Sequence, residues 1–137
     1  MAEIHDLQIA DANNTGLYPG SMNVRQLDDS GRSLCGMVAR KHRDNDGSNT
    51  TTGTGAAYAL TLNQSGITAV ANAGQICVRF HVANTGAATL AINALGAKAI
   101  TKRGGAALVV GDILANDLCI IAYNPARDQF QLMSAGA

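Results

Sequence analysis

The sequence predicts a mainly β protein: a small antiparallel β-sandwich or barrel, preceded by an extended arm and one amphipathic α-helix. Apolar residues recur at every second position in the C-terminal half, which is the period of a half-buried strand. In residues 23–43 they recur every three or four positions instead, which is the period of a helix. Turn-forming residues separate the short apolar runs at the spacing typical of sandwiches and small barrels.

Residues 1–22 are expected to form the extended arm. They show no sustained hydrophobic period and contain turn formers such as Asn13, Gly16 and Pro19. A terminal segment without a core of its own is either disordered or docked on another surface. The sequence leaves both alternatives open.

Residues 23–46 are expected to contain the amphipathic helix. Its apolar or small residues are spaced three and four apart and include Val24, Leu27, Gly31, Leu34 and Val38. We predict that these five residues are assembly contacts, because such a stripe can pack against the helices of sister copies and a glycine permits close approach. The alternative is that the helix packs on the sheet of its own chain.

The remainder of the chain divides into a linker and a β domain. Residues 47–57, GSNTTTGTGAA, have the composition of a flexible Gly/Ser/Thr linker. Residues 58–137 are expected to form the β domain. Its clearest strand lies at residues 76–82, and a terminal hairpin is expected between residues 118 and 133.

The composition favours self-association and argues against nucleic acid as a partner. The chain carries 10 basic and 10 acidic side chains, so it lacks the surplus of Lys and Arg that phosphate binding requires. Five aromatic residues and no Trp leave a core built mainly from small aliphatic side chains. Such a core buries little area in one copy, and a surface so poor in charge is typical of a protein buried in an oligomer.

Neither disulfides nor a membrane span are expected. Cys35, Cys77 and Cys119 are odd in number and widely spaced, which fits free thiols in a protein made in a reducing cytoplasm. The N-terminus lacks the basic and apolar regions of a signal peptide, and no stretch has the length of apolar residues that crosses a bilayer. A soluble protein without a membrane partner is therefore expected.

The sequence provides no convincing set of catalytic or metal-binding residues. His5 lies in the arm, His42 at the end of the helix and His81 on the polar face of a strand, and no serine sits in a Gly-x-Ser-x-Gly elbow. No spacing typical of a zinc or calcium site occurs either. We therefore predict a protein that is not an enzyme and has no catalytic residues, metal or other cofactor.

Several segments carry a resemblance to a known family. The stretch SMNVRQLDDSGRSL at residues 21–34, continuing into an Arg-Asp pair and a Gly/Thr-rich segment, resembles the N-terminal helical motif of tailed-phage tail-fibre proteins. The segments TGAAYALT at residues 54–61, VRF at 78–80 and NTGAATLAINALGAKAI at 84–100 resemble the β module that follows this motif. The pieces occur in the order found in the family. The long shaft and receptor-binding tip of a tail fibre are not expected in this chain.

The resemblance implies a structural protein of a tailed-phage virion, made in the host bacterial cytoplasm. The expected form is a short tail-fibre or attachment protein, a symmetric oligomer with a homotrimer preferred, bound to other capsid or tail proteins of the particle. A capsid decoration protein is the first alternative. A carbohydrate-binding β domain that contacts a host glycan is the second, although few aromatic side chains are available to stack on sugar rings.

Overall fold

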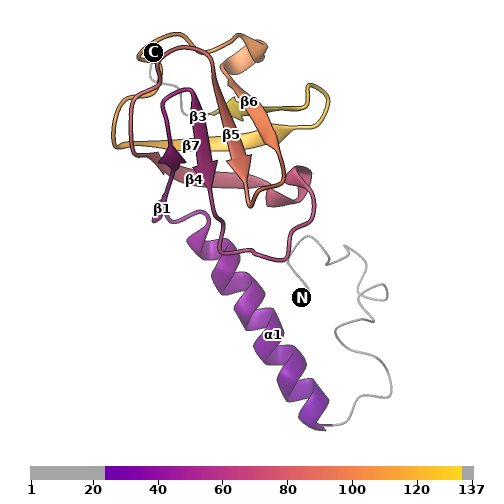
Figure 1. The fold of residues 1–137 in the computed structure, drawn as a ribbon. Coiled ribbons are helices and arrows are strands. Elements are labelled where there is room, and N and C mark those ends of the chain that lie inside the picture. Colours follow the sequence, from indigo (N-terminus) through magenta and orange to yellow (C-terminus); the bar gives the residue numbers. More distant parts are fainter. Residues whose placement is uncertain (1–23, 134–137) are drawn as a thin grey trace.

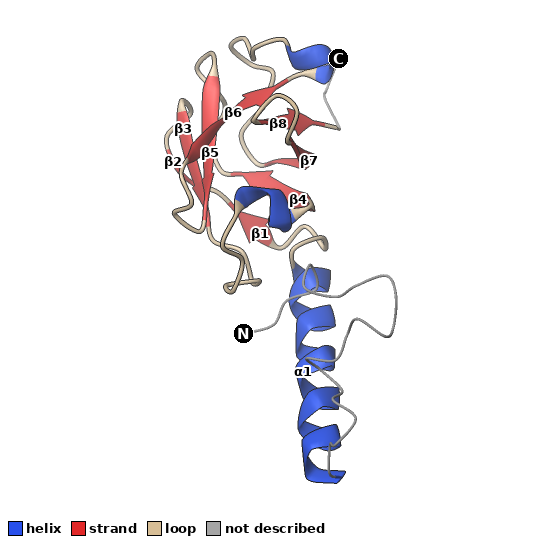
Figure 2. Cartoon of the chain, turned by 90° about the vertical axis from the view of Figure 1, so that its right-hand side faces the viewer, coloured by secondary structure: helices blue, strands red, loops and turns tan. Residues whose placement is uncertain are grey.

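The change of hydrophobic period near residue 44 divides the molecule into two parts of different shape. The structure is a computed structural model that describes residues 24–133. A long helix projects from a sheet that curls nearly into a barrel (Figures 1 and 2). The arm expected at residues 1–22 lies outside the described residues.

The elements follow the predicted order of one helix and then many short strands. The helix, α1, spans Val24–Arg43. The strands are β1 Asn49–Thr50, β2 Thr52–Gly53, β3 Ala57–Leu60, β4 Gln75–Phe80, β5 Ala88–Ile92, β6 Ala97–Thr101, β7 Asp117–Asn124 and β8 Gln129–Leu132. Two 3₁₀ helices, η3 Val70–Ala73 and η4 Arg103–Gly105, lie between strands. The mainly β class and the preceding helix are therefore confirmed.

All eight strands belong to one sheet, in the order β1-β4-β7-β8-β6-β5-β3-β2. The expected C-terminal hairpin is confirmed, because β7 and β8 pair antiparallel with Tyr123 opposite Phe130. Three other pairs, β1 with β4, β3 with β5 and β6 with β8, are parallel. The sheet is thus mixed rather than wholly antiparallel. The alternation of buried and exposed side chains does not reveal whether a strand runs parallel or antiparallel to its neighbour, because side chains alternate with a period of two in both kinds of pairing.

A single residue joins the two edges of the sheet. The outermost strands β1 and β2 are consecutive in the chain, with only Thr51 between them. The backbone N–H of Thr51 donates to Arg79 O at 2.9 Å, and His81 N donates to Thr51 Oγ1 at 3.2 Å. The His81 ring also joins the two edges of the sheet, with Nδ1 2.9 Å from Thr51 Oγ1 and Nε2 3.3 Å from Gly53 O. A carbonyl only accepts, so Nε2 carries the ring proton and the Thr51 hydroxyl donates to Nδ1.

The expectation of a flexible linker at residues 47–57 is wrong. Within this segment β1 pairs with β4, β2 pairs with β3, and the side chains of Asn49 and Thr51 are buried. The segment has no large apolar residue, which is why its composition resembles a linker, but its backbone groups are satisfied by strands that come later in the chain. The sheet therefore begins at Asn49 and not at residue 58.

The core of the barrel is aliphatic, as expected, with three aromatic rings among its buried side chains. Tyr58, Phe80 and Phe130 are buried, and the rings of Tyr58 and Phe80 meet edge to face with centroids 4.8 Å apart. The Tyr58 hydroxyl donates to Val82 O at 2.9 Å, which satisfies its polar end. One copy thus encloses a core within its own barrel.

We expect Thr51→Val to destabilise the protein by about 1–3 kcal/mol. The isosteric change removes the hydroxyl and leaves the backbone N–H and the ring Nδ1 of His81 without their partner at the junction of the two sheet edges. Chemical denaturation measures the loss. Thr50→Val is the control, because Thr50 is the exposed neighbour on β1, and its effect should stay within about 0.5 kcal/mol. Equal losses of stability in the two variants would show that the Thr51 hydroxyl does not hold the two sheet edges together.

Candidate assembly surface

The apolar stripe of α1 remains open to solvent over most of the helix. The helix extends away from the barrel, which meets only its C-terminal end (Figures 1 and 2). Leu27 and Val38 are each 53% exposed, and Leu34 is half-buried. Within the described part of the chain, the alternative of a helix lying on its own sheet therefore holds only for the last turns of α1.

The five predicted contact residues have the spacing of a coiled-coil seam. Val24, Leu27, Gly31, Leu34 and Val38 follow one another at intervals of three, four, three and four residues. Val24 begins the helix, and its side chain lies outside the described set. A Cβ built at Gly31 meets nothing within 4 Å. The structure therefore places Leu27, Gly31 and Leu34 where another helix could approach closely.

A buried carboxylate fastens the base of α1 to the barrel. Asp44, which directly follows the helix, has no exposed surface. Its Oδ1 accepts hydrogen bonds from Asn49 Nδ2 at 3.2 Å, Asn63 N at 2.8 Å and Asn63 Nδ2 at 2.9 Å. Its Oδ2 accepts from Gln64 N at 3.2 Å and Gln64 Nε2 at 3.0 Å. The backbone joins as well, because Cys77 N on β4 donates to Asp44 O at 3.1 Å.

Two more residues of the last helical turns strengthen this attachment. The side chain of Met37 is fully buried. Lys41 Nζ donates to Ala73 O at 2.8 Å and to Gln75 O at 3.2 Å, so it caps the end of η3 and the start of β4. Partial burial lowers the pKa of Lys41, and the nearby Asp44 carboxylate opposes that shift. The helix is thus held at one end by contacts that fix its direction relative to the barrel.

Sequence reasoning missed this network because Asp44 stands in the run Asp-Asn-Asp-Gly. Such a run is also a stop signal for a helix, and nothing in it reveals that the loop at residues 63 and 64 folds back onto the carboxylate.

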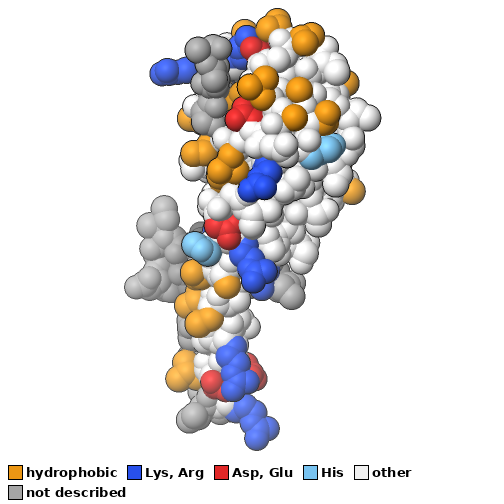
Figure 3. Space-filling view, turned by 90° about the vertical axis from the view of Figure 1, so that its left-hand side faces the viewer, with side chains coloured by type: hydrophobic (Ala, Val, Ile, Leu, Met, Phe, Trp, Pro, Cys, Tyr) orange, Lys and Arg blue, Asp and Glu red, His pale blue; other side chains and the backbone are white. Residues whose placement is uncertain are grey.

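A second exposed apolar region lies on the barrel. Val82, Val109, Val110, Leu114 and Leu118 are exposed there, and Val110 is the most open, at 73%. Hydrophobic side chains appear along α1 and over the barrel in the same view (Figure 3). We call these five residues the barrel patch. Its only sequence signal was the adjacent pair Val109-Val110 before a Gly-Asp turn.

Side-chain hydrogen bonds hold the loop that carries most of the barrel patch. Asn84 Nδ2 donates to Val109 O at 2.7 Å, and Ile113 N donates to Asn84 Oδ1 at 2.9 Å. Val109 N donates to Asp112 Oδ2 at 2.6 Å, and Lys102 Nζ lies 2.8 Å from the same oxygen. The Lys102 ammonium, followed by the Val109 N–H, holds the pKa of Asp112 below 3.8. Exposure of the valines is therefore a property of a well-anchored loop.

The histidines and cysteines do not converge on a catalytic arrangement among residues 24–133. His42 is exposed on α1, and the His81 ring is hydrogen-bonded to the Thr51 hydroxyl. Cys77 and Cys119 face opposite sides of the sheet, because Cys119 pairs with Val78 and shares its buried face. The cysteines are free thiols, with Cys35 exposed on the helix and Cys119 buried. His5 lies outside the described residues.

A scan of the sequence against protein-family models finds no match, and a search of the curated proteins finds no similar one. In the part of the chain that the structure describes, three or more His, Cys, Asp or Glu side chains nowhere gather to hold a metal ion. None of the helices described there combines the length and apolar character needed to cross a membrane.

We expect Asp44→Ala to lower the free energy of unfolding by roughly 3–5 kcal/mol, because several buried donors lose their acceptor at once. Asp44→Asn should be nearly as harmful, since its amide nitrogen would face donors. Denaturant titration measures both. The control is Asp46→Ala, which removes only an exposed acceptor of the Ser48 N–H, and a loss as large there would contradict the role of Asp44.

The stability that Asp112 contributes should depend on pH. Its pKa is lowered in the folded state, so the contribution is present above 3.8 and is lost as the pH falls through the folded-state value. We expect the stability difference between wild type and Asp112→Asn to be larger at pH 6 than at about pH 3. Thermal unfolding at both pH values measures it, and a difference that does not change would contradict the ion pair with Lys102.

Proposed function

We propose that the chain is a non-enzymatic structural protein that assembles as a symmetric oligomer through α1, in the particle of a tailed phage. The form proposed is a short tail-fibre or attachment protein, in which α1 makes the assembly contacts and the barrel faces outward. Self-association and the phage setting rest on different grounds, and each needs its own test.

One observation carries the self-association: a helix held firmly at its base presents an apolar seam to water along most of its length. Leu27 and Val38 are more than half exposed. An exposed apolar stripe of this kind is typical of an interaction surface. Since Asp44 and Lys41 fix the base of α1, the seam cannot be covered by folding the helix down onto the barrel without breaking buried hydrogen bonds.

The spacing of the seam fits a helical bundle built from identical copies. With Val24 at position a, Leu27 and Leu34 fall at d, and Gly31 and Val38 fall at a. A homotrimer is the stoichiometry we propose. Valine at a with leucine at d also suits two-stranded coiled coils, so the mass of the oligomer decides between three copies and two.

The phage setting is supported by the resemblance of residues 21–34 to the helical motif of tail-fibre proteins, and of residues 54–61, 78–80 and 84–100 to their β module. Attachment to a particle by a projecting helix is compatible with either a tail or a capsid location. A capsid decoration protein would use the same two surfaces, and the symmetry of its position on the particle would separate the two cases.

A sugar-binding role receives less support from the described tyrosines. Tyr58 is buried in the core, and the hydroxyl of the half-buried Tyr123 donates to Asp128. Neither ring is presented as an open platform on which a sugar could stack.

We expect wild-type protein at tens of micromolar to have, by light scattering, three times the 14.1 kDa mass of one chain. Leu27→Asp with Leu34→Asp should reduce the mass to one chain, because two carboxylates would have to be desolvated in the seam. Ser33→Asp with Ala39→Asp adds the same charge at exposed positions outside the seam and should leave the mass unchanged.

A wild-type protein that stays at the mass of one chain would sink the assembly proposal, and a mass of two chains would correct its stoichiometry. The phage setting is tested by adding the purified protein to tailed-phage particles that lack it. Full-length protein should bind and the Leu27→Asp, Leu34→Asp variant should not. Equal binding by both would show that α1 does not make the attachment.

A further inference from the structure

Among the buried side-chain nitrogen and oxygen atoms of residues 24–133, one has no hydrogen-bond partner in that part of the chain. It is the amide oxygen Oε1 of Gln64. Gln64 has no exposed surface and follows β3, in the loop that passes over the C-terminal end of α1 (Figure 1). A carbonyl oxygen that is buried without accepting a hydrogen bond has lost its hydration and gained nothing in return. The atom therefore needs a donor.

The other end of the Gln64 amide fixes its orientation. Nε2 donates to Asp44 Oδ2 at 3.0 Å, and the backbone N–H of Gln64 donates to the same oxygen at 3.2 Å. Turning the amide over would place Oε1 against a carboxylate oxygen, where two acceptors would face each other without a proton between them. Oε1 therefore points away from Asp44, and its donor has to come from another group.

The loop around Gln64 is held on both sides, so the oxygen cannot swing out to solvent. In the turn between β5 and β6, Asn93 Oδ1 accepts from Leu62 N at 2.8 Å, and Asn93 Nδ2 donates to Gln64 O at 3.1 Å. On the side of the helix, Asn63 N and Nδ2 donate to Asp44 Oδ1 at 2.8 and 2.9 Å. Exposing Oε1 to solvent would break hydrogen bonds at both places.

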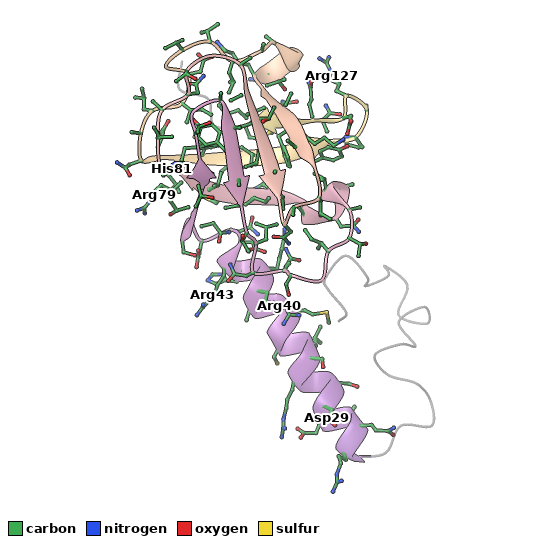
Figure 4. The ribbon with its side chains drawn as sticks, viewed as in Figure 1. Asp29, Arg40, Arg43, Arg79, His81 and Arg127 are labelled. Atoms are coloured by element: carbon green, nitrogen blue, oxygen red, sulfur yellow. The ribbon has the colours of Figure 1, made fainter. Side chains whose placement is uncertain are left out.

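The surroundings of Gln64 have the chemistry of an internal hydration site. One carboxylate and three amide side chains belong to the hydrogen-bond network around it: Asp44, Asn49, Asn63 and Asn93. Figure 4 shows side chains with nitrogen and oxygen atoms gathered between the end of α1 and the barrel. Waters inside proteins occupy polar sites of this kind, where a buried group needs a partner. A metal ion fits less well, because both carboxylate oxygens of Asp44 already accept from N–H groups.

We propose that Gln64 Oε1 binds a buried water molecule, which completes the polar network that fastens α1 to the barrel. The water donates one O–H to Oε1 and uses its other hydrogen-bonding positions on polar groups of the same junction. The hydrogen bond gained by a buried acceptor outweighs the entropy lost when one water is immobilised. The inference goes beyond the proposed function and does not depend on it, because Gln64 and its named partners all belong to one chain.

The bound water is expected to exchange slowly with solvent. Neither Gln64 nor Asp44 has exposed surface, so the water leaves only when the loop at residues 63 and 64 lifts from the end of α1. Local opening of this kind is much slower than the exchange of water on a protein surface. The lifetime of the water therefore reports how often the attachment of the helix opens.

The first test is a crystal structure of the full chain at a resolution that shows buried waters. We expect a water oxygen within about 3.0 Å of Gln64 Oε1. A map without density at that position overturns the proposal. A protein donor from outside residues 24–133 in the same place overturns it as well.

The second test counts long-lived internal waters in solution, by magnetic relaxation dispersion of the water oxygen signal. Gln64→Met removes the acceptor with little change of volume and should lower the wild-type count by one. The control is Gln75→Met, the same change at an exposed position of β4, which should keep the wild-type count. An unchanged count in Gln64→Met that circular dichroism shows to be folded contradicts the proposal. If Gln64→Met does not fold, the crystal structure of the wild type decides.

Discussion

A carboxylate with no exposed surface stands at the point where the helix ends and the sheet begins. Asp44 collects donors from β1 and from the loop at residues 63 and 64, while its own carbonyl accepts from β4. Burying an ionised group this deeply costs several kcal/mol unless its oxygens are fully hydrogen-bonded. The loop must therefore fold over the helix end before that cost is offset. This coupling makes the direction of α1 a consequence of how the barrel is built.

Side-chain hydrogen bonds hold two further parts of the barrel. The Thr51 hydroxyl and the His81 ring join the two edges of the sheet, and Asn84 pins the loop between β6 and β7. These side chains hydrogen-bond to backbone groups that the short strands leave without a partner in the sheet. They also explain how a barrel with strands of only two residues at its edges keeps a defined shape. Edge strands this short offer few backbone groups for pairing with other chains.

Within residues 24–133, the exposed apolar surfaces are held in fixed positions. Exposed large apolar side chains lie on the stripe of α1, in the barrel patch and at Met133, and polar networks hold the base of α1 and the loop of the patch. Rigid apolar surfaces are suited to assembly by repetition of a single contact, because a rotation axis then brings equivalent surfaces of identical copies together. The low charge of the chain, with 10 cations and 10 anions, lets copies approach without long-range repulsion.

The sequence by itself determined the elements whose signals are local. The spacing of Leu27, Leu34 and Val38 revealed the helix and its seam, and the alternation through residues 76–82 and the C-terminal hairpin revealed strands. Such patterns can be recognised in one segment alone, because the spacing of apolar residues depends only on whether the backbone of that segment is helical or extended. The tertiary structure alone decided the parallel pairings, the use of residues 49–53 as edge strands, the barrel patch and the role of Asp44. Each of these depends on groups that are distant in sequence, such as Thr51 and His81, 30 positions apart, or Asp44 and Gln64, 20 apart. A polar residue in a turn has the same neighbours in the sequence whether its side chain hydrogen-bonds to water or to a buried amide. Only the tertiary structure shows which partner it has.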